Sequence, residues 1–288
     1  MRAPCRVCRG RAFLDQKGMS RAIRAALQPN PFRGPEALNH SAYAAWSAGE
    51  LVHPLEPGRS VTPLARAVHG RFRAHILDAE FPCVGGKAAI SHDNYRFGLY
   101  AEMNSQGATA GLAHDLWEYA RERRTFETDY ATFVASFIEP VGACELEWEK
   151  LLWGQLQRLH DLDSAHHEWD PAVSSDPADP GFSFSFAGTA FFVVGLHPAS
   201  SRRSRRFAWP TLVFNAHEQF ERLRDQNRFE RLRATVRGRD YKLQGSLNPN
   251  LSNFGEASEA RQYSGRAVKE DWRCPFSARR GAPEKPKK

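Results

Sequence analysis

The sequence is poor in cysteine and has no long hydrophobic run. Five cysteines in 288 residues are too few for a disulfide scaffold, and their odd number leaves at least one thiol free. The longest largely apolar stretch, Phe186 to Leu196, has eleven residues, whereas a membrane-spanning helix needs roughly 18. The N-terminus starts basic but lacks the apolar segment of a secretory signal. These absences predict a cytoplasmic protein with reduced cysteines and no membrane anchor.

Generic catalytic motifs are absent as well. The sequence contains no phosphate-binding P-loop, no glycine fingerprint of a dinucleotide-binding fold, no Gly-x-Ser-x-Gly and no His-Glu-x-x-His. Composition and spacing alone therefore indicate a globular domain without specifying a reaction. Any functional hypothesis has to come from polar residues that lie next to the predicted core elements.

Basic charge is present, but it is not concentrated in the body of the chain. The formal net charge is +7. Residues 1–60 hold nine basic and four acidic residues, and residues 277–288 hold five and one, which leaves the middle slightly acidic. Because phosphate binding needs a concentrated positive field, this distribution argues against a dedicated nucleic-acid-binding protein.

One internal segment is rich in arginine. Eleven arginines and no lysine lie between residues 202 and 239. Acidic residues are interleaved with them, several at the three- or four-residue spacing that pairs charges on a helix. This pattern favours a solvated, ion-paired face, and an arginine-rich nucleic-acid-binding module remains the less favoured alternative.

Residues 61–276 carry the pattern of a single folded domain. Apolar spacing predicts helices over 63–79, 108–123, 145–162 and 217–238, and strands over 96–103, 130–138, 182–186, 189–196 and 211–215. Several strands follow each other without an intervening helix, which predicts an α+β fold with a mixed, largely antiparallel sheet packed by helices. Scattered proline and glycine predict that residues 1–60 form a poorly ordered extension, and residues 277–288 a basic disordered tail.

Polar residues gather immediately after the most apolar predicted strand. His197 follows Leu196, and an arginine-rich loop that includes Arg202 and Arg206 comes next. An imidazole there can bind a metal or haem iron or act as an acid or base, and the arginines can hold carboxylates or phosphates. On the sequence alone, a capped strand end followed by a solvated basic loop is the favoured explanation of the same residues.

A second polar cluster marks the passage from a strand into a helix. Asn215 is placed to cap that helix, with Glu218 three residues later as in a capping box. This structural interpretation leaves His217 unexplained, as either a surface residue or a ligand directed over the sheet. Cys83 precedes another possible helix, where a thiolate has a lowered pKa, although a small buried cysteine is the commoner case.

Taken together, these motifs resemble the YqcI/YcgG family over about residues 62–276, most densely over 169–276. The segments that carry the resemblance are Phe81-Pro-Cys83, Trp169 to Pro177, Phe182 to Phe186, Gly195 to Pro198, Ser201-Arg202, Pro210 to His217, Gln244 to Ser246, Asn248-Pro249, Ser258 to Arg266 and Asp271 to Phe276. Characterised members of that family are haem-dependent N-hydroxylases of guanidino compounds. The resemblance thus implies a haem protein that uses oxygen or peroxide to hydroxylate a guanidino or amino group of a small arginine-like metabolite.

The resemblance also implies roles for particular residues. His217 is the preferred axial ligand of haem b, because a helix can hold its imidazole rigidly, with His197 and the thiolate of Cys83 as alternatives. Arg202, Arg206 and Arg266 are candidate partners of the haem propionates. Asp176, Glu218 or Glu259 can hold a guanidinium through paired hydrogen bonds. A haem-free binding protein or other enzyme, in which both histidines are structural, is the competing hypothesis.

Overall fold

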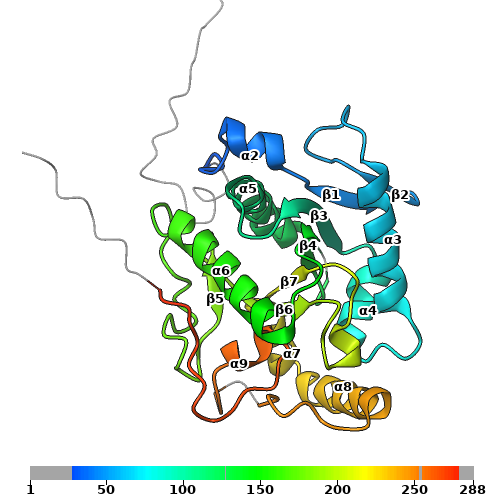
Figure 1. Ribbon diagram of the computed structural model, residues 1–288, viewed down its shortest axis with the longest axis vertical. Coiled ribbons are helices and arrows are strands. Elements are labelled where there is room, and N and C mark those ends of the chain that lie inside the picture. Colours follow the sequence, from blue (N-terminus) through cyan, green and yellow to red (C-terminus); the bar gives the residue numbers. More distant parts are fainter. Residues whose placement is uncertain (1–27, 127, 253–254, 279–288) are drawn as a thin grey trace, which may run out of the picture.

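The computed structural model describes residues 28–126, 128–252 and 255–278. In these residues, eight α-helices surround a seven-stranded sheet (Figure 1). The strands are β1 (Ala44–Ser47), β2 (Glu50–Val52), β3 (Tyr95–Glu102), β4 (Thr132–Glu139), β5 (Phe184–Phe186), β6 (Thr189–Leu196) and β7 (Thr211–Ala216). The helices are α2 (Pro35–His40), α3 (Pro63–Leu77), α4 (Val84–Ser91), α5 (Gln106–Glu122), α6 (Glu145–Asp163), α7 (His217–Asp225), α8 (Phe229–Gln244) and α9 (Ala260–Tyr263). Two short 3-10 helices, η2 (Arg123–Thr125) and η3 (Arg203–Arg205), complete the described elements.

The sheet has the strand order β2-β1-β3-β4-β7-β6-β5. The β3–β4 pair is parallel, and the other five strand pairs are antiparallel. The parallel pair is joined through α5, as a crossover connection requires. The prediction of an α+β domain with a mixed, largely antiparallel sheet is therefore confirmed.

The two faces of the sheet are covered by different helices (Figure 1). On one face α5 and α6 pack onto the sheet through a large aromatic and aliphatic core that includes Leu116, Trp148 and Leu152. On the other face α3 and α4 cover the half of the sheet made by β1, β3 and β4, through Phe72 and Ile76 among others. The remaining half of that second face, over β6 and β7, is covered differently and holds the site described below.

Local sequence explains the elements that border this site. Thr62 caps α3, accepting a hydrogen bond from the backbone N–H of Ala65, and Pro63 follows at the first helical position. Ala187 and Gly188 form the two-residue turn of the β5–β6 hairpin, with φ values of 52° and 64°. Two positive φ angles are typical of the two-residue hairpin turn whose twist matches that of the flanking strands.

Residues 28–60 are not a loose extension, contrary to the prediction. They contribute α2, and they add β1 and β2 to the edge of the sheet beside β3. The buried carboxylate of Asp115 on α5 holds this segment by accepting hydrogen bonds from the Ser41 hydroxyl and the Ala42 N–H, at 2.6 and 2.7 Å. Strands of four and three residues are too short to show a clear alternation, which is why the pattern missed them. Residues 1–27, and residues 279–288 of the predicted tail, lie outside the described residues.

The predicted helix over 217–238 is two helices. α7 ends at Asp225 and α8 begins at Phe229, with Asn227 between them at φ 55°. Asn is one of the few residues that accept this left-handed conformation, so the break is encoded locally. The apolar spacing continues across it, which is what predicted one helix. No α-helix in the described part of the chain is long and apolar enough to cross a membrane.

Candidate functional site: an apolar cavity beside the sheet

A cavity of about 360 Å³ lies over the half of the second sheet face that β6 and β7 form. β6 and β7 form its floor, and α4, α7 and α8 form its walls. The lining is mainly apolar, with Phe192, Val194 and Val213 from the sheet, Phe81 and Ile90 from the α4 side, and Phe220, Phe229, Leu232 and Val236 from α7 and α8. Its volume is within the roughly 300–1,000 Å³ of small-molecule sites.

The helix α8 makes the outer wall of this cavity. Phe229, Leu232 and Val236 lie three and four residues apart, so they share one side of the helix, and all three line the cavity. The far end of α8 is tied to the loop after β6, because Asp240 pairs with Arg202 and accepts a hydrogen bond from the Ser204 hydroxyl at 3.1 Å. These links hold α8 in place while its apolar residues remain only partly buried.

The cavity has two chemically different ends. The α7 end is defined by His217, Phe220, Arg224 and Glu259, and the η3 end by Cys83, Arg202, Arg205, Arg237 and Asp240. The strand β6 runs from one end to the other. Its residue Phe192, which pairs with Asn215, lines the α7 end, and its last residue, Leu196, lines the η3 end. Along α8, the eleven-residue step from Phe229 to Asp240 corresponds to roughly 16 Å of helix.

His217 supplies an imidazole to the cavity wall. It is the first residue of α7, directly after β7, and it is only 5% exposed. Its Nε2 lies 2.9 Å from Oε1 of Glu221, one turn along the helix. Burial lowers the pKa of His217, against the opposing effect of the Glu221 carboxylate. A neutral imidazole with one nitrogen fixed by a carboxylate is the usual form of a histidine ligand.

The capping box predicted at the start of α7 does not form. Ala216 occupies the N-cap position, and the Asn215 amide donates to the backbone carbonyls of Phe192 and Val213 instead. The helix is positioned by Gln219, whose side-chain oxygen accepts a hydrogen bond from Ala131 N–H at 3.0 Å.

Glu259 is a buried carboxylate in the cavity wall. Its Oε1 accepts hydrogen bonds from the hydroxyls of Ser183 at 2.6 Å and Tyr263 at 2.5 Å. Burial raises the pKa of Glu259 to about 7, although both hydroxyl donors act in the opposite direction. The sequence singled out this residue, and the structure places it at the α7 end together with His217.

Cys83 lies at a helix N-terminus, as predicted, but its thiol is not activated. It is the N-cap of α4, and its sulfur accepts a hydrogen bond from Gly86 N–H at 3.3 Å. Burial raises the pKa of Cys83, and this effect outweighs the backbone hydrogen bonds and the nearby Arg205, which lower it. Because desolvation dominates, the raised pKa favours the commoner of the two alternatives, a structural cysteine, over an activated thiolate.

Three arginines surround the η3 end. Arg202 is bound by the carboxylate of Asp240 and the backbone carbonyl of Ser246. The guanidinium of Arg205 donates to the carbonyls of Gly195, Tyr263 and Gln262, each at 3.2 Å. Burial lowers the pKa of Arg205 to about 10, so the group still carries its charge at neutral pH. Arg237 lines the cavity from α8, one turn before Asp240.

His197 does not line this cavity. It is 1% exposed, and its ring stacks on Trp148 of α6, with centroids 5.1 Å apart and planes inclined by 18°. Neither ring nitrogen has a hydrogen-bond partner within the described residues, and burial lowers the pKa of His197 to about 4. The structure therefore separates the two predicted histidines: one faces the cavity and the other is packed against α6.

The other predicted site residues also lie outside the cavity lining. Asp176 is exposed in a turn and caps the N–H of Ala178, and Glu218 pairs with Arg123 and Arg222 on the surface of α7. Arg206 is exposed and donates to the Ser200 carbonyl, while Arg266 forms a two-pronged pair with Glu149 of α6. Their hydrogen bonds link elements of the fold and bring none of them to the cavity.

Sequence reasoning missed most of the cavity lining. Arg205 and Arg237 were part of the arginine-rich segment but were not distinguished from the surface arginines around them. The available signal for Arg237 is its spacing, because it lies one residue after Val236, five after Leu232 and three before Asp240. No metal-binding group of three or more His, Cys, Asp or Glu side chains occurs among the described residues.

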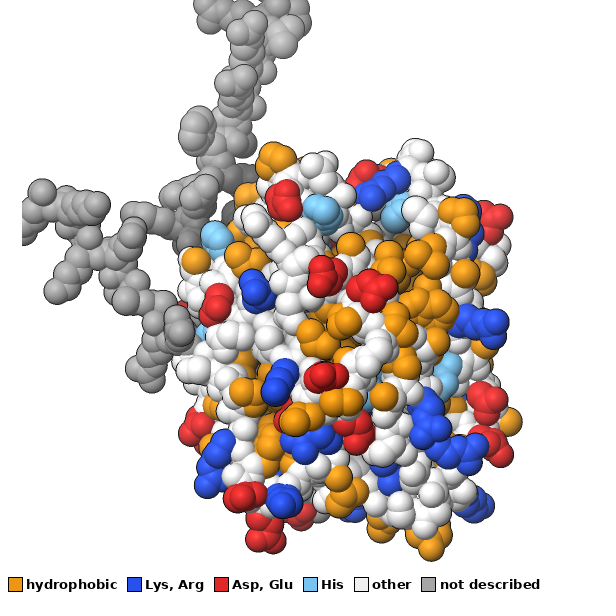
Figure 2. Space-filling model, viewed as in Figure 1, with side chains coloured by type: hydrophobic (Ala, Val, Ile, Leu, Met, Phe, Trp, Pro, Cys, Tyr) orange, Lys and Arg blue, Asp and Glu red, His pale blue; other side chains and the backbone are white. Residues whose placement is uncertain are grey.

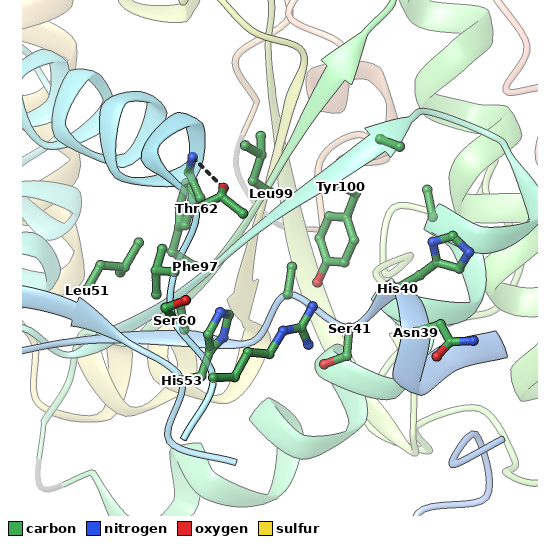
Figure 3. Close-up of a pocket in the computed structure, with 17 residues that line it drawn as sticks. Asn39, His40, Ser41, Leu51, His53, Ser60, Thr62, Phe97, Leu99 and Tyr100 are labelled. Atoms are coloured by element: carbon green, nitrogen blue, oxygen red, sulfur yellow. Dashed lines mark hydrogen bonds between the residues drawn. The ribbon is translucent and has the colours of Figure 1, made fainter. Parts of the chain in front are cut away.

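A second, smaller cavity of about 190 Å³ lies at the other end of the sheet. Figure 3 shows Asn39, His40 and Ser41 on one side of it and Leu51, His53 and Ser60 on the other, with Tyr100 between. Its polar groups already have structural partners: Ser41 and Tyr100 donate to Asp115, and His53 Nδ1 lies 3.0 Å from the Tyr43 carbonyl. This arrangement anchors residues 28–60, and it includes none of the predicted site residues.

Several arginines of the arginine-rich segment are ion-paired at the surface. Arg222 pairs with Glu218, Arg228 with Asp129, and Arg233 with Glu230. On the face seen in Figure 2, basic side chains gather in the lower half with acidic side chains among them. This agrees with the interleaved charges in the sequence and gives little support to a nucleic-acid-binding surface.

Residues 72–277 match the YqcI/YcgG family. The chain is 30% identical to the protein YcgG of Bacillus subtilis strain 168 over 207 residues, which are 68% of this chain and 81% of that protein. It is 28% identical to YqcI of the same organism over 194 residues, which are 64% and 75% of the two chains. Both relatives are described as uncharacterised. No solved structure matches the chain.

Proposed function

The chain belongs to the YqcI/YcgG family, and on that premise we propose that it is a haem-dependent oxygenase that N-hydroxylates a guanidino or amino group of a small arginine-like metabolite in the cytoplasm. The observation that carries the proposal is the buried imidazole of His217 in the wall of an apolar cavity that also contains unneutralised arginine charge. Haem needs an axial ligand, apolar surfaces for the porphyrin and cations for its two propionates, and the cavity offers each of these.

His217 is the residue that would hold the iron. Glu221 engages its Nε2 and thereby orients the imidazole in the cavity wall. The lowered pKa keeps the imidazole neutral near pH 7, as ligation requires. When bound, haem supplies the oxygen-activating chemistry that no side chain can supply alone. The oxidant in the proposal is O2 or peroxide.

Glu259 is the residue that would hold the substrate. A guanidinium presents parallel N–H groups that match a carboxylate, and Glu259 is the carboxylate at the same end of the cavity as His217. Ser183 and Tyr263 fix Oε1, while Oε2 accepts no hydrogen bond from the described residues. A cationic substrate would also lower the pKa of Glu259 and stabilise its charged form.

The test is the visible spectrum of the full-length protein, purified from cells supplied with a haem precursor and, separately, reconstituted with hemin. We expect a Soret band in the wild type. His217→Ala should abolish the ligand-specific spectrum, and His197→Ala should retain it if the variant folds. Circular dichroism and the melting temperature of each variant show whether a lost spectrum reflects a lost fold. A wild-type protein without a Soret band after reconstitution would overturn the proposal.

A haem-free small-molecule-binding protein is the second candidate. The observation that favours it is that the cavity has a carboxylate at one end and arginines at the other, which suits a small zwitterionic metabolite without iron. In that case hemin would leave the melting temperature unchanged, whereas arginine-like metabolites would raise it.

A further inference from the structure

We infer that the η3 end of the cavity is a binding site for an anionic group of the ligand, such as a carboxylate, held by Arg237 together with Arg205. The inference rests on the proposed function only in placing the ligand in this cavity. It does not require that the ligand be haem, and it replaces the arginines that the sequence alone suggested.

Charge pairing within the described lining distinguishes these two arginines from their neighbours. Arg202 is neutralised by Asp240, Arg224 by Glu221 and Arg233 by Glu230. In the described part of the chain, Arg205 contacts backbone carbonyls but no carboxylate, and Arg237 has neither an ion-pair nor a hydrogen-bond partner. Three arginines and the single carboxylate of Asp240 therefore leave the η3 end with a net charge of about +2.

The surroundings make this charge effective. Val194, Leu196 and Val236 line the same region, and in such a weakly polar setting a charge attracts an anion more strongly than it does in water. Three carbonyls fix the Arg205 guanidinium, so little rotamer entropy is lost when an anion binds. Arg237 is on α8, from which its side chain, unpaired within the described residues, can close on the same anion.

The η3 end also differs from a surface anion site. Arg205 is half-buried, and its three carbonyl contacts connect β6 to the end of α9, so its position follows from the packing of the fold. The apolar stretch between the two ends then selects a ligand with an apolar body and an acidic end. An inorganic anion alone would leave that stretch uncovered.

A pair of fluorescent dyes tests this inference with the full chain and without haem. The dye 8-anilinonaphthalene-1-sulfonate has an apolar body and one anionic group, and N-phenyl-1-naphthylamine has the same body without the sulfonate. We expect Arg237→Gln to weaken binding of the sulfonate dye about tenfold and to change the dissociation constant of the neutral dye less than twofold. Arg231→Gln is the matched control, because Arg231 is exposed on the same helix and does not line the cavity.

The result is decided by the ratio of the two dissociation constants in each variant. A selective loss for the sulfonate dye in Arg237→Gln, absent from Arg231→Gln, supports the site. Equal losses for both dyes, no loss for either, or the same loss in the control would overturn it. Arg205→Lys, which keeps the charge but not the three-carbonyl contact, should give a smaller selective loss. Because no haem is present, a missing Soret band and a failed dye test are separate results.

Discussion

The two faces of β6 differ although they belong to the same eight residues. Phe191 and Val193 point to the side of α5 and α6, where the core is close-packed and both side chains are fully buried. Phe192 and Val194 point to the other side, where they form the floor of the cavity and remain partly exposed. One strand therefore supports stability with one face and a ligand site with the other, and alternate substitutions along it can separate the two properties.

The largest expected difference comes from two neighbouring phenylalanines. Phe191→Ala removes a buried aromatic ring from the packed face and should lower the free energy of unfolding by about 3–5 kcal/mol. Phe192→Ala removes a ring that already borders empty space, so we expect a clearly smaller loss, about 1–2 kcal/mol. Urea denaturation of both variants measures the difference. Equal losses would contradict the contrast between the two faces.

A smaller difference is expected from adding volume to each face. A Cβ at Gly195 would lie 2.7 Å from Leu152 Cδ1 and 2.9 Å from the backbone oxygen of Tyr263, so Gly195→Ala should cost about 1–3 kcal/mol. Val194→Phe extends a ring into the cavity. It should change stability little and weaken the binding of the neutral dye, N-phenyl-1-naphthylamine. The two melting temperatures and the dye titration check this prediction. A strongly destabilised Val194→Phe would mean that the cavity cannot accept the added ring.

The last contrast is in pH dependence, where the two sides should respond in opposite directions. The folded-state pKa of His197, about 4, is below its ordinary 6.5. Its contribution to the free energy of unfolding is therefore complete above pH 6.5 and is lost as the pH falls towards 4. The folded-state pKa of Glu259, about 7, is above its ordinary 4.5, so its contribution is complete below pH 4.5 and is lost as the pH rises through 7.

Each of these dependences should amount to about 3 kcal/mol over its full pH range, since a difference of one in pKa corresponds to about 1.4 kcal/mol. His197→Phe should flatten the decline of the unfolding free energy below pH 6.5. Glu259→Gln should flatten its decline between pH 4.5 and 7. Unfolding free energies measured from pH 4 to pH 8 provide the check. If the Glu259→Gln curve runs parallel to the wild type over that interval, the buried carboxylate does not titrate as described.

The sequence predicted the central elements well and the cavity poorly, for a physical reason. The apolar run of β6 and the periodic spacing of α6 depend on local pattern, and both were found within a few residues of their observed bounds. His197 and His217 look alike in sequence, because each is next to an apolar strand. Their different surroundings depend on which helix covers each strand end, and that information is not local. Glu259 was recognised as a candidate, but its position beside His217 depends on α9 folding back onto β6.

The edge formed by β1 and β2 has a consequence for how this protein can be shortened. The family match begins at residue 72, which is inside α3, whereas the sheet already includes Ala44 to Val52. A chain cut at the family boundary would lose the start of α3 and leave β3 as an open edge strand, a ready template for self-association. The unit to express, crystallise or engineer is therefore longer at its N-terminal end than the region that matches the family.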